Sequence, residues 1–192
     1  MLNGVLEWDR DLLVFLNTAG GETYDAFWQW ATVAVNWVPL FLILLILIYR
    51  KLGAKSLVGL LLVLAFCMLF TATCTDLVKL TFARLRPVND PDIRPLLRVI
   101  RGSSSYSFFS GHAANSFAAT TLLYLMLRKK MVWIGAFFIW PMIFSYSRLY
   151  LGLHFPTDIL VGALFGVLAA SLCYLIYSRS NLFKAFKVLD SK

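Results

Sequence analysis

Charged side chains are scarce in this sequence of 192 residues. Only 15% of the residues are Asp, Glu, Lys or Arg, whereas 60% are hydrophobic and 16% are aromatic. No water-soluble core needs so much apolar surface, and long apolar runs with few charges are typical of segments that cross a bilayer. The composition therefore excludes an ordinary soluble domain and predicts an all-α, polytopic membrane helix bundle.

Cysteine and acidic residues are also few, and each shortage excludes a kind of site. The three cysteines all lie inside apolar runs, so we interpret them as small buried hydrophobic residues. The sequence contains no acidic cluster with metal-ligand spacing, so we expect neither a metal nor another cofactor. Glu7, Asp9 and Asp11 stand where a cleavable leader would have a basic start, so we expect the membrane spans themselves to direct insertion.

Five apolar runs have the length of membrane spans. We expect these spans at about residues 26–49, 56–82, 111–127, 131–150 and 157–177. Residues 1–22 alternate apolar and charged positions, which predicts an amphipathic helix in the membrane interface that ends at Gly20-Gly21. Residues 1–192 contain no internal repeat or domain boundary, so we interpret them as a single membrane-embedded domain with a basic tail at 178–192.

Positive charge is unevenly distributed along the chain. Ten of the 18 Lys and Arg residues fall in residues 50–55, 128–130 and 178–192, which five spans place on one side. The positive-inside rule makes that side the cytoplasm. Seven others lie on the opposite side, around residues 83–109 and 147–158, and this costly violation of the rule suggests function. We therefore expect an inner (plasma) membrane protein whose site faces the periplasm or the exterior. The formal net charge of +8 then reflects topology and not nucleic-acid binding.

Two cations near the end of the second predicted span, Lys79 and Arg86, are seven residues apart. This spacing corresponds to about two helical turns, so both side chains lie on one face and form a rigid anion site. Asp76, one turn before Lys79, is expected to hold it by an ion pair. The alternative is that the two cations only extend to the lipid headgroups at a helix end.

Ser110-Gly111-His112 opens the third predicted span. A serine cap followed by glycine exposes backbone N–H groups at the positive end of a helix, which suits a phosphate. His112 lies in the first turn, where it can donate a proton to a bound group. The alternative is an ordinary helix cap with an interfacial histidine.

The segment from Ser147 to Asp158 concentrates polar chemistry between two apolar runs. Arg148 can hold a phosphate or carboxylate in a two-pronged grip, His154 can attack or carry protons, and Asp158 can orient the imidazole. Taken alone, it is equally an ordinary loop whose polar residues face water. This segment and the two described above all fall on one predicted side, which favours a shared site.

In order and spacing these residues resemble a known signature. Lys79-x6-Arg86-Pro87, Ser110-Gly111-His112 and Ser147-Arg148-x5-His154-x3-Asp158 are similar to the three-part signature of the type 2 phosphatidic acid phosphatase (PAP2) superfamily. The resemblance covers roughly residues 56–177. Phe109 departs from the family pattern, which usually has proline there, and the family commonly shows six membrane helices where this chain shows five and an interfacial segment.

The resemblance implies a metal-independent lipid phosphatase of the acid-phosphatase type. His154 would attack phosphorus to form a phosphohistidine, Asp158 would fix its tautomer, and His112 would protonate the leaving oxygen and then activate water. The growing charge on the phosphoryl oxygens would be neutralised by Lys79, Arg86, Arg148, Ser110 and the N–H group of Gly111.

The long connection between the second and third spans adds Arg94, Arg98 and Arg101, at spacings of four and three. Since Pro95 can start a helix, we expect the three arginines to share a helical face that binds a second phosphate or an acidic headgroup. The alternative is a loop in loose contact with anionic lipid. A second phosphate site favours undecaprenyl diphosphate, a lipid of the cell envelope, as substrate. Phosphatidylglycerophosphate and the phosphate of lipid A are the next candidates.

Other functions remain open from the sequence. A lipid phosphotransferase of the same fold differs only in its acceptor, whereas a non-catalytic carrier of anionic lipids would bind without turnover and would not need His154. The superfamily that the chain resembles also includes the vanadium haloperoxidases. A haloperoxidase is disfavoured here because those enzymes are soluble. We expect the lipid phosphate substrate and membrane lipids as partners, and no nucleic acid; nothing in the sequence indicates an oligomeric state.

Overall fold

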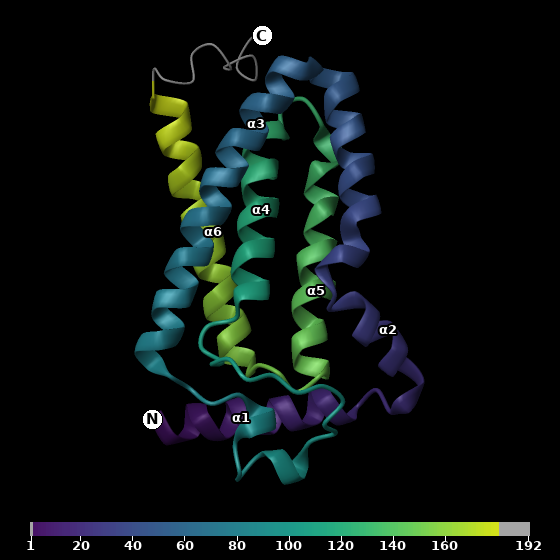
Figure 1. Cartoon of the computed structure of the whole chain (residues 1–192), viewed down its shortest axis with the longest axis vertical. Helices are drawn as coiled ribbons and strands as arrows, with labels where there is room; N and C mark the ends of the chain where they lie inside the picture. Colours follow the sequence, from purple (N-terminus) through teal and green to yellow (C-terminus); the bar gives the residue numbers. More distant parts are fainter. Residues whose placement is uncertain (1, 181–192) are drawn as a thin grey trace.

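The computed structural model describes residues 2–180, and every regular element in this part of the chain is a helix. With η denoting a 3-10 helix, the order is α1 (Leu2–Thr18), η1 (Glu22–Tyr24), α2 (Asp25–Ala31), η2 (Ala34–Trp37), α3 (Val38–Phe82), η3 (Pro87–Asn89), η4 (Arg94–Leu96), α4 (Gly111–Leu127), η5 (Val132–Phe138), α5 (Ile139–Tyr150) and α6 (Pro156–Arg179). Helices α3 to α6 stand side by side, and α1 runs across one end of the bundle (Figure 1). The predicted all-α membrane bundle is confirmed.

Within the described residues, three segments are long and apolar enough to cross a membrane: Ala34–Asn89, Val132–Tyr150 and Pro156–Arg179. The first contains α3, which reverses direction at Gly53, where a φ of 78° interrupts the helix (Figure 1). The second predicted span and the later part of the first are therefore the limbs of one helical hairpin, whereas the earlier part of the first forms α2 and η2. Helix α4 occupies the third predicted span and is largely buried by its neighbours. The number of spans stays a prediction, but the chain is an integral membrane protein.

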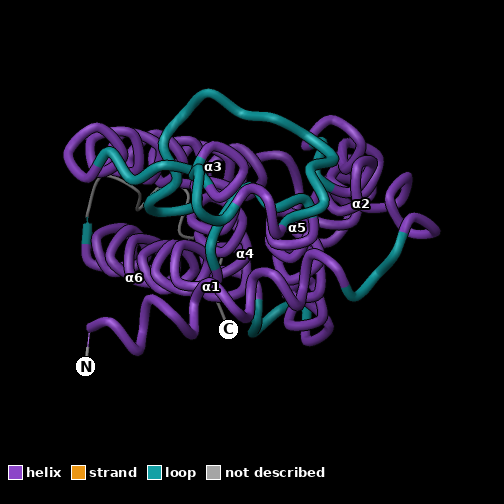
Figure 2. The backbone as a smooth tube through the Cα atoms, turned by 90° about the horizontal axis from the view of Figure 1, so that it is seen from below, coloured by secondary structure: helices purple, strands orange, loops and turns teal. Residues whose placement is uncertain are grey.

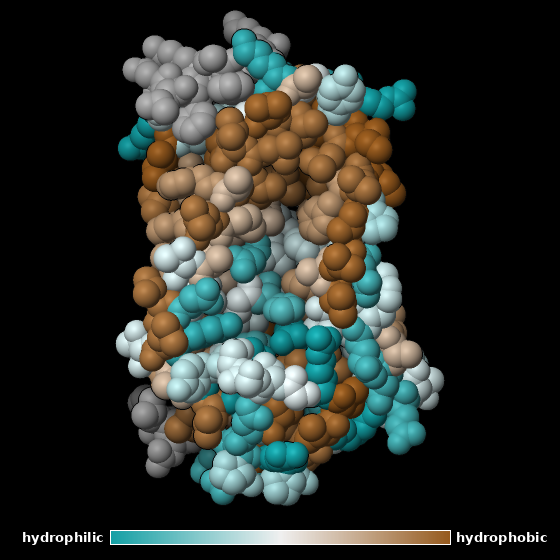
Figure 3. All heavy atoms as spheres, viewed as in Figure 1, coloured by the Kyte–Doolittle hydropathy of each residue, from teal (hydrophilic) through white to brown (hydrophobic). Residues whose placement is uncertain are grey.

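An apolar belt covers much of the bundle surface (Figure 3). Leu69 on α3 and Leu164 and Leu168 on α6 point outward with 60 to 69% of their surface exposed. Soluble monomers rarely expose an apolar surface this large, so these side chains face lipid. Hydrophilic atoms gather in the lower half of the same view and in a hollow near its centre (Figure 3).

The basic turns and the long connection lie at opposite ends of the bundle. Residues 50–55 and 128–130 lie at the upper end in Figure 1, together with the C-terminal end of α6, whereas the long connection and α1 lie at the lower end. Lys184, Lys187 and Lys192 of the predicted basic tail lie outside the described residues.

Helix α4 is central, and α6 packs against its backbone. A Cβ atom added at Gly162 would lie 2.7 Å from the carbonyl oxygen of Ser110, and one at Gly166 would be closer still to that of Ala114. Only glycine permits such an approach, as is typical of helix pairs in membranes. Because the N–H group of Ser110 donates to the carbonyl of Asp158 at 3.0 Å, the starts of α4 and α6 are held together.

Helix α1 lies across the end of the bundle that carries the long connection (Figures 1 and 2). Its buried Leu13 packs with Leu149 and Phe155, whereas Trp8 and Phe15 are exposed. This two-sided character suits the predicted interfacial helix, which has one face on the protein and one available to lipid.

The predicted helix that starts at Pro95 is wrong, because η4 is only one turn long. The chain instead turns Arg98 toward the N-terminal region. The N–H group of Arg98 donates to Oδ1 of Asn17 at 2.7 Å, and its guanidinium forms an ion pair with Asp25 at 2.8 Å. These long-range bonds outweigh the local helix preference, so the three loop arginines do not share a helical face.

Candidate active site

The predicted site residues come from separate segments that meet at the end of the bundle next to α1. Lys79 lies in the last turn of α3; Ser110, Gly111 and His112 open α4; Arg148 lies in the last turn of α5; His154 precedes α6 and Asp158 lies in its first turn. The three parts of the signature are therefore brought together. The expected helical face shared by Lys79 and Arg86 is wrong, because α3 ends at Phe82 and Arg86 follows in an extended conformation.

His154 and Asp158 form the buried centre of this region. Nδ1 of His154 lies 3.4 Å from Oδ2 of Asp158, and the two side chains are 1% and 0% exposed. The same Oδ2 accepts the N–H group of Phe155 at 2.9 Å, so the aspartate reaches back to cap its own helix. The cap fixes the direction in which the carboxylate faces the imidazole.

Ser107 belongs to this centre, although no sequence motif points to it. Its hydroxyl donates to Oδ2 of Asp158 and lies 3.3 Å from Nδ1 of His154, and the residue is fully buried. The only local signal is a small polar residue between the aromatic residues Tyr106 and Phe108. That signal has no periodicity, because the connection is irregular there.

Burial keeps the His154 imidazole neutral. The pKa of His154 is lowered to about 3, chiefly by removal from water and also by the positive charges of Arg86 and Arg148, while Asp158 acts in the opposite direction. A neutral imidazole has the lone pair that a nucleophile needs. Because Nδ1 faces Asp158, Nε2 is the nitrogen left to attack a substrate.

Two buried guanidinium groups lie close to this histidine. Arg86 donates to the carbonyl of Leu153 at 3.1 Å and, through two nitrogens, to Ser105 at 2.8 Å each. Arg148 donates to the hydroxyl of Thr32 at 2.7 Å. Nε of Arg148 is buried and has no hydrogen-bond partner in the described part of the chain. An unpaired buried donor is costly, and a bound anion would satisfy it.

Lys79 lies beside the start of α4, since a Cβ added at Gly111 would be 3.6 Å from its Nζ atom. The expected ion pair between Lys79 and Asp76 is wrong: among the described residues none joins them, although both line one cavity. Although one helical turn separates the two residues, their charged groups do not come within ion-pair distance. The ammonium group of Lys79 therefore remains available to a ligand.

His112 projects from the first turn of α4. Its Nε2 atom lies 3.3 Å from the carbonyl oxygen of Thr32, and its ring stacks on Phe144 with centroids 4.6 Å apart. Ser110 caps the helix by accepting the N–H group of Ala113 at 3.4 Å, which leaves its own O–H group able to donate.

A cavity of about 560 Å³ extends from His112 between α3, α4 and α5. Its polar end contains Asp76, Lys79, His112 and Asn115, and Oδ1 of Asn115 is buried without a partner among the described residues. The remaining walls are mainly apolar and include Phe41, Leu64, Met68, Ala119, Trp140 and Phe144. This shape suits a molecule with a polar end and a hydrocarbon body.

The loop arginines differ in their relation to the site. Arg98 is held by Asp25 and is not brought to it. Arg94 and Arg101 are exposed, and Arg101 lies close enough to Arg148 for the two positive charges to repel each other. Only Arg101 is therefore placed to meet a group bound near Arg148.

Comparisons with known proteins identify the family of the chain. The family model of the PAP2 superfamily matches residues 60–182. The chain is 33% identical over 183 residues to a lipid A 4'-phosphatase of Bacteroides thetaiotaomicron, covering 92% of this chain and 80% of that protein. It is 31% identical over 181 residues to an undecaprenyl-diphosphatase of Sulfolobus acidocaldarius, covering 94% and 76%.

Two solved structures have a similar fold. A PAP2-type phosphatidylglycerolphosphate phosphatase from Bacillus subtilis has a TM-score of 0.68 at 21% identity, over 95% of this chain and 90% of that one. LpxE from Aquifex aeolicus has a TM-score of 0.56 at 24% identity, over 86% and 93%. Together with the matching family model, these likenesses lead to one conclusion: the chain belongs to the PAP2 superfamily and is an integral membrane lipid phosphatase, a hydrolase of phosphoester bonds.

Proposed function

We propose that the enzyme works through a phosphohistidine on His154. Nε2 of His154 attacks phosphorus and forms a P–N bond, while the P–O bond to the lipid breaks and the lipid oxygen takes a proton from His112. A water molecule that gives a proton back to His112 then attacks the phosphorus, which breaks the P–N bond and releases inorganic phosphate. The observation that carries this proposal is the buried imidazole whose Nδ1 faces Oδ2 of Asp158 at 3.4 Å.

The surrounding donors suit the transition state. Charge grows on the three non-bridging phosphoryl oxygens during the transfer, and fixed donors in a site that excludes water stabilise that charge most strongly. In this proposal the oxygens are bound by Lys79, Arg86, Arg148, the hydroxyl of Ser110 and the N–H group of Gly111. This assignment is supported by Nε of Arg148 and the ammonium group of Lys79, which have no hydrogen-bond or ion-pair partner, respectively, within residues 2–180.

The preferred substrate is a phosphate monoester on a hydroxylated lipid headgroup, of which the 4'-phosphate of lipid A is the leading candidate. Asp76 and Asn115 add two acceptors to the polar end of the cavity, next to His112. A sugar offers hydroxyl donors to them, whereas a prenyl chain offers none. The likeness to lipid A 4'-phosphatases of Bacteroides thetaiotaomicron and, at 28% identity, Porphyromonas gingivalis supports this choice.

Undecaprenyl diphosphate, the substrate that the sequence favours, becomes the second candidate. The arginine face on which that expectation rests is not assembled, since Arg98 is paired with Asp25. Arg101 near Arg148 still offers one contact for a second phosphate, and the Sulfolobus undecaprenyl-diphosphatase is a relative. A phosphatidylglycerophosphatase of Bacillus subtilis matches 50% of this chain, which keeps phosphatidylglycerophosphate as a third candidate.

The site faces the periplasm or the exterior of the inner (plasma) membrane in this proposal. The basic turns at residues 50–55 and 128–130 lie at the opposite end of the bundle, and the positive-inside rule assigns such turns to the cytoplasm. The exposed apolar face of α1 then rests in the outer interface of that membrane.

Phosphate release from purified protein in lipid nanodiscs tests the proposal. Lipid A, undecaprenyl diphosphate, undecaprenyl phosphate and phosphatidylglycerophosphate would be compared by kcat/KM, with His154→Ala as the inactive control. We expect turnover of all substrates to depend on His154, and lipid A to have the highest kcat/KM. Binding without release of phosphate would instead identify a carrier, and transfer to an added lipid alcohol with no phosphate released would identify a phosphotransferase. A higher value for undecaprenyl diphosphate would reverse the order of candidates.

A further inference from the structure

An acidic residue on the interfacial helix is buried completely. Asp9 of α1 is 0% exposed, although its helix neighbours Trp8 and Asp11 are exposed. Burying a carboxylate is costly unless it is paired and fully hydrogen-bonded. Neither the family signature nor the chemistry proposed above uses Asp9, so its burial needs another reason.

The partners of Asp9 come from the catalytic end of the bundle. Its Oδ1 accepts the N–H group of Thr157 at 2.8 Å, and its Oδ2 accepts the hydroxyl of Thr157 at 2.6 Å. The same Oδ2 forms an ion pair with Arg84 at 2.9 Å. Thr157 is the residue before Asp158, so α1 is bonded directly to the first turn of α6.

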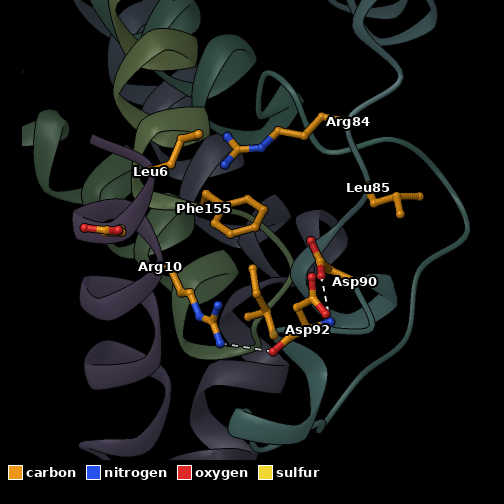
Figure 4. Close-up of a pocket in the computed structure, with 9 residues that line it drawn as sticks. Leu6, Arg10, Arg84, Leu85, Asp90, Asp92 and Phe155 are labelled. Carbon is orange, nitrogen blue, oxygen red and sulfur yellow. Dashed lines mark hydrogen bonds between the residues drawn. The ribbon is translucent and has the colours of Figure 1, made fainter. Parts of the chain in front are cut away.

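Arg84 connects the two carboxylates. Its Nη2 donates to Asp9, while its Nη1 donates to Oδ1 of Asp158 at 2.8 Å and to the hydroxyl of Thr157 at 3.0 Å. The guanidinium also lies over the ring of Phe155, 3.8 Å from its centroid (Figure 4). Arg84 is thus held in one plane, and it binds the oxygen of Asp158 that does not face His154.

The chain of contacts runs from Asp9 through Arg84 and Asp158 to His154. Each oxygen of Asp158 then has a fixed role, since Oδ1 meets Arg84 and Oδ2 meets His154. Arg84 divides its positive charge between two carboxylates. Asp9 therefore keeps Arg84 from neutralising Asp158 alone and leaves Asp158 more charge with which to stabilise a cationic imidazole.

We propose that Asp9, acting through Arg84, is a positioning residue for the His154–Asp158 pair. Docking of α1 is then part of building the active site, and not only a means of membrane attachment. This inference rests on the proposed role of His154 as nucleophile.

The test is the change Asp9→Asn in the full-length protein in nanodiscs, which keeps the shape and removes the charge. We expect kcat to fall by about tenfold or more with little change in KM, because misplacement of a reacting group costs rate and not ground-state binding. Asp11→Asn is the matched control, since it makes the same change at an exposed position of the same helix. It should leave kcat and KM as in the wild type.

A double-mutant comparison separates positioning from general damage. If Asp9 acts through Arg84, Asp9→Asn should cost little further kcat in an Arg84→Gln background, whereas two unrelated defects would multiply. Thr157→Val provides a milder variant should Asp9→Asn fail to fold. It removes the hydroxyl shared by Asp9 and Arg84 but keeps the backbone N–H bond, and we expect a several-fold loss of kcat.

Two results would overturn the inference. Wild-type kcat in Asp9→Asn, or in Thr157→Val where Asp9→Asn does not fold, would overturn the inference; so would a full multiplicative loss in the double variant. Trapping of phosphate on His154 in the wild type is measured in parallel. Its absence would instead count against the proposed nucleophile, so the two failures can be told apart.

Discussion

Nδ1 of His154 lies 3.4 Å from Oδ2 of Asp158 in a place where neither side chain reaches solvent. A carboxylate at this position favours the tautomer with the proton on Nδ1, and in the proposed mechanism it stabilises the positive charge that the ring acquires when Nε2 bonds to phosphorus. His112 has no carboxylate partner among the described residues, because Nε2 faces the carbonyl of Thr32. The two histidines are therefore suited to different steps.

This difference predicts different defects. His154→Ala should lower kcat by about 1,000-fold or more, because the covalent route is lost. His112→Ala should still form a phosphoenzyme with p-nitrophenyl phosphate, whose leaving group needs no proton, but should hydrolyse it slowly. The measurement is a burst of p-nitrophenol together with labelled phosphate on the protein. Comparable turnover by the His154→Ala protein would exclude the covalent mechanism.

The low pKa of His154 predicts an unusual pH dependence. With a pKa of about 3, His154 stays neutral from pH 8 down to pH 5. The neutral fraction of an ordinary histidine, with a pKa of about 6.5, would fall roughly thirtyfold over the same range. Phosphoenzyme formation by His112→Ala should therefore be nearly constant from pH 8 to 5, after correction for ionisation of the substrate. A thirtyfold decline would show that His154 has an ordinary pKa.

The same pKa shift has a consequence for stability. Between pH 6.5 and 3 the unfolded chain binds a proton at His154 that the folded protein does not. The free energy of unfolding should therefore decrease as the pH falls through this window. Comparison with His154→Gln, which lacks the titrating group, isolates this contribution.

The family residues could be predicted because each part of the signature is short. Lys79 and Arg86, or His154 and Asp158, lie close in sequence, so the members of each pair stay near one another although α3 ends before Arg86 and α6 begins after His154. Ser107 was not predicted, because it meets Asp158 only through a contact 51 residues away in sequence. Such contacts depend on the path of an irregular connection, which has no periodicity.

The N-terminal helix shows a similar limit. The alternating apolar and charged residues predict an amphipathic helix, but the pattern says neither how it lies on the bundle nor which acid is buried. Asp9 and Asp11 look alike in the sequence, and only Asp9 meets Arg84 and Thr157. The helix expected from Pro95 failed for the related reason that Asp25 holds Arg98 elsewhere.

The proposed orientation can be tested by labelling whole cells with an impermeant thiol reagent, in a variant whose three cysteines are replaced by serine. Lys51→Cys and Lys129→Cys should resist the reagent and Asn89→Cys should react, because all three positions are exposed and differ in the end of the bundle that carries them. Permeabilised cells provide the control for reactivity. The reverse pattern would place the site on the cytoplasmic side.

The backbone contact between α4 and α6 predicts a sensitive position. Gly162→Ala would place a methyl group 2.7 Å from the carbonyl of Ser110, so the helices must separate and the start of α4 must move. We expect a loss of about 1–3 kcal/mol in stability, as for overpacked cores, together with reduced kcat. Gly135→Ala is the control, because its methyl group would meet Tyr124 at an ordinary 3.8 Å. Equal melting temperatures for the two variants would contradict the close contact.

The cavity between α3, α4 and α5 connects the reaction to two different media, the lipid bilayer and water. Its apolar walls belong to helices whose outer faces meet lipid, so substrate arrives by lateral diffusion, whereas inorganic phosphate has to leave through water. The reaction rate therefore depends on the mole fraction of substrate among the lipids of the bilayer, and not on its concentration in the bulk solution. Diluting its substrate with inert lipid will slow the reaction even when the amount of substrate per volume is unchanged, and the dephosphorylated lipid product will compete from within the same bilayer.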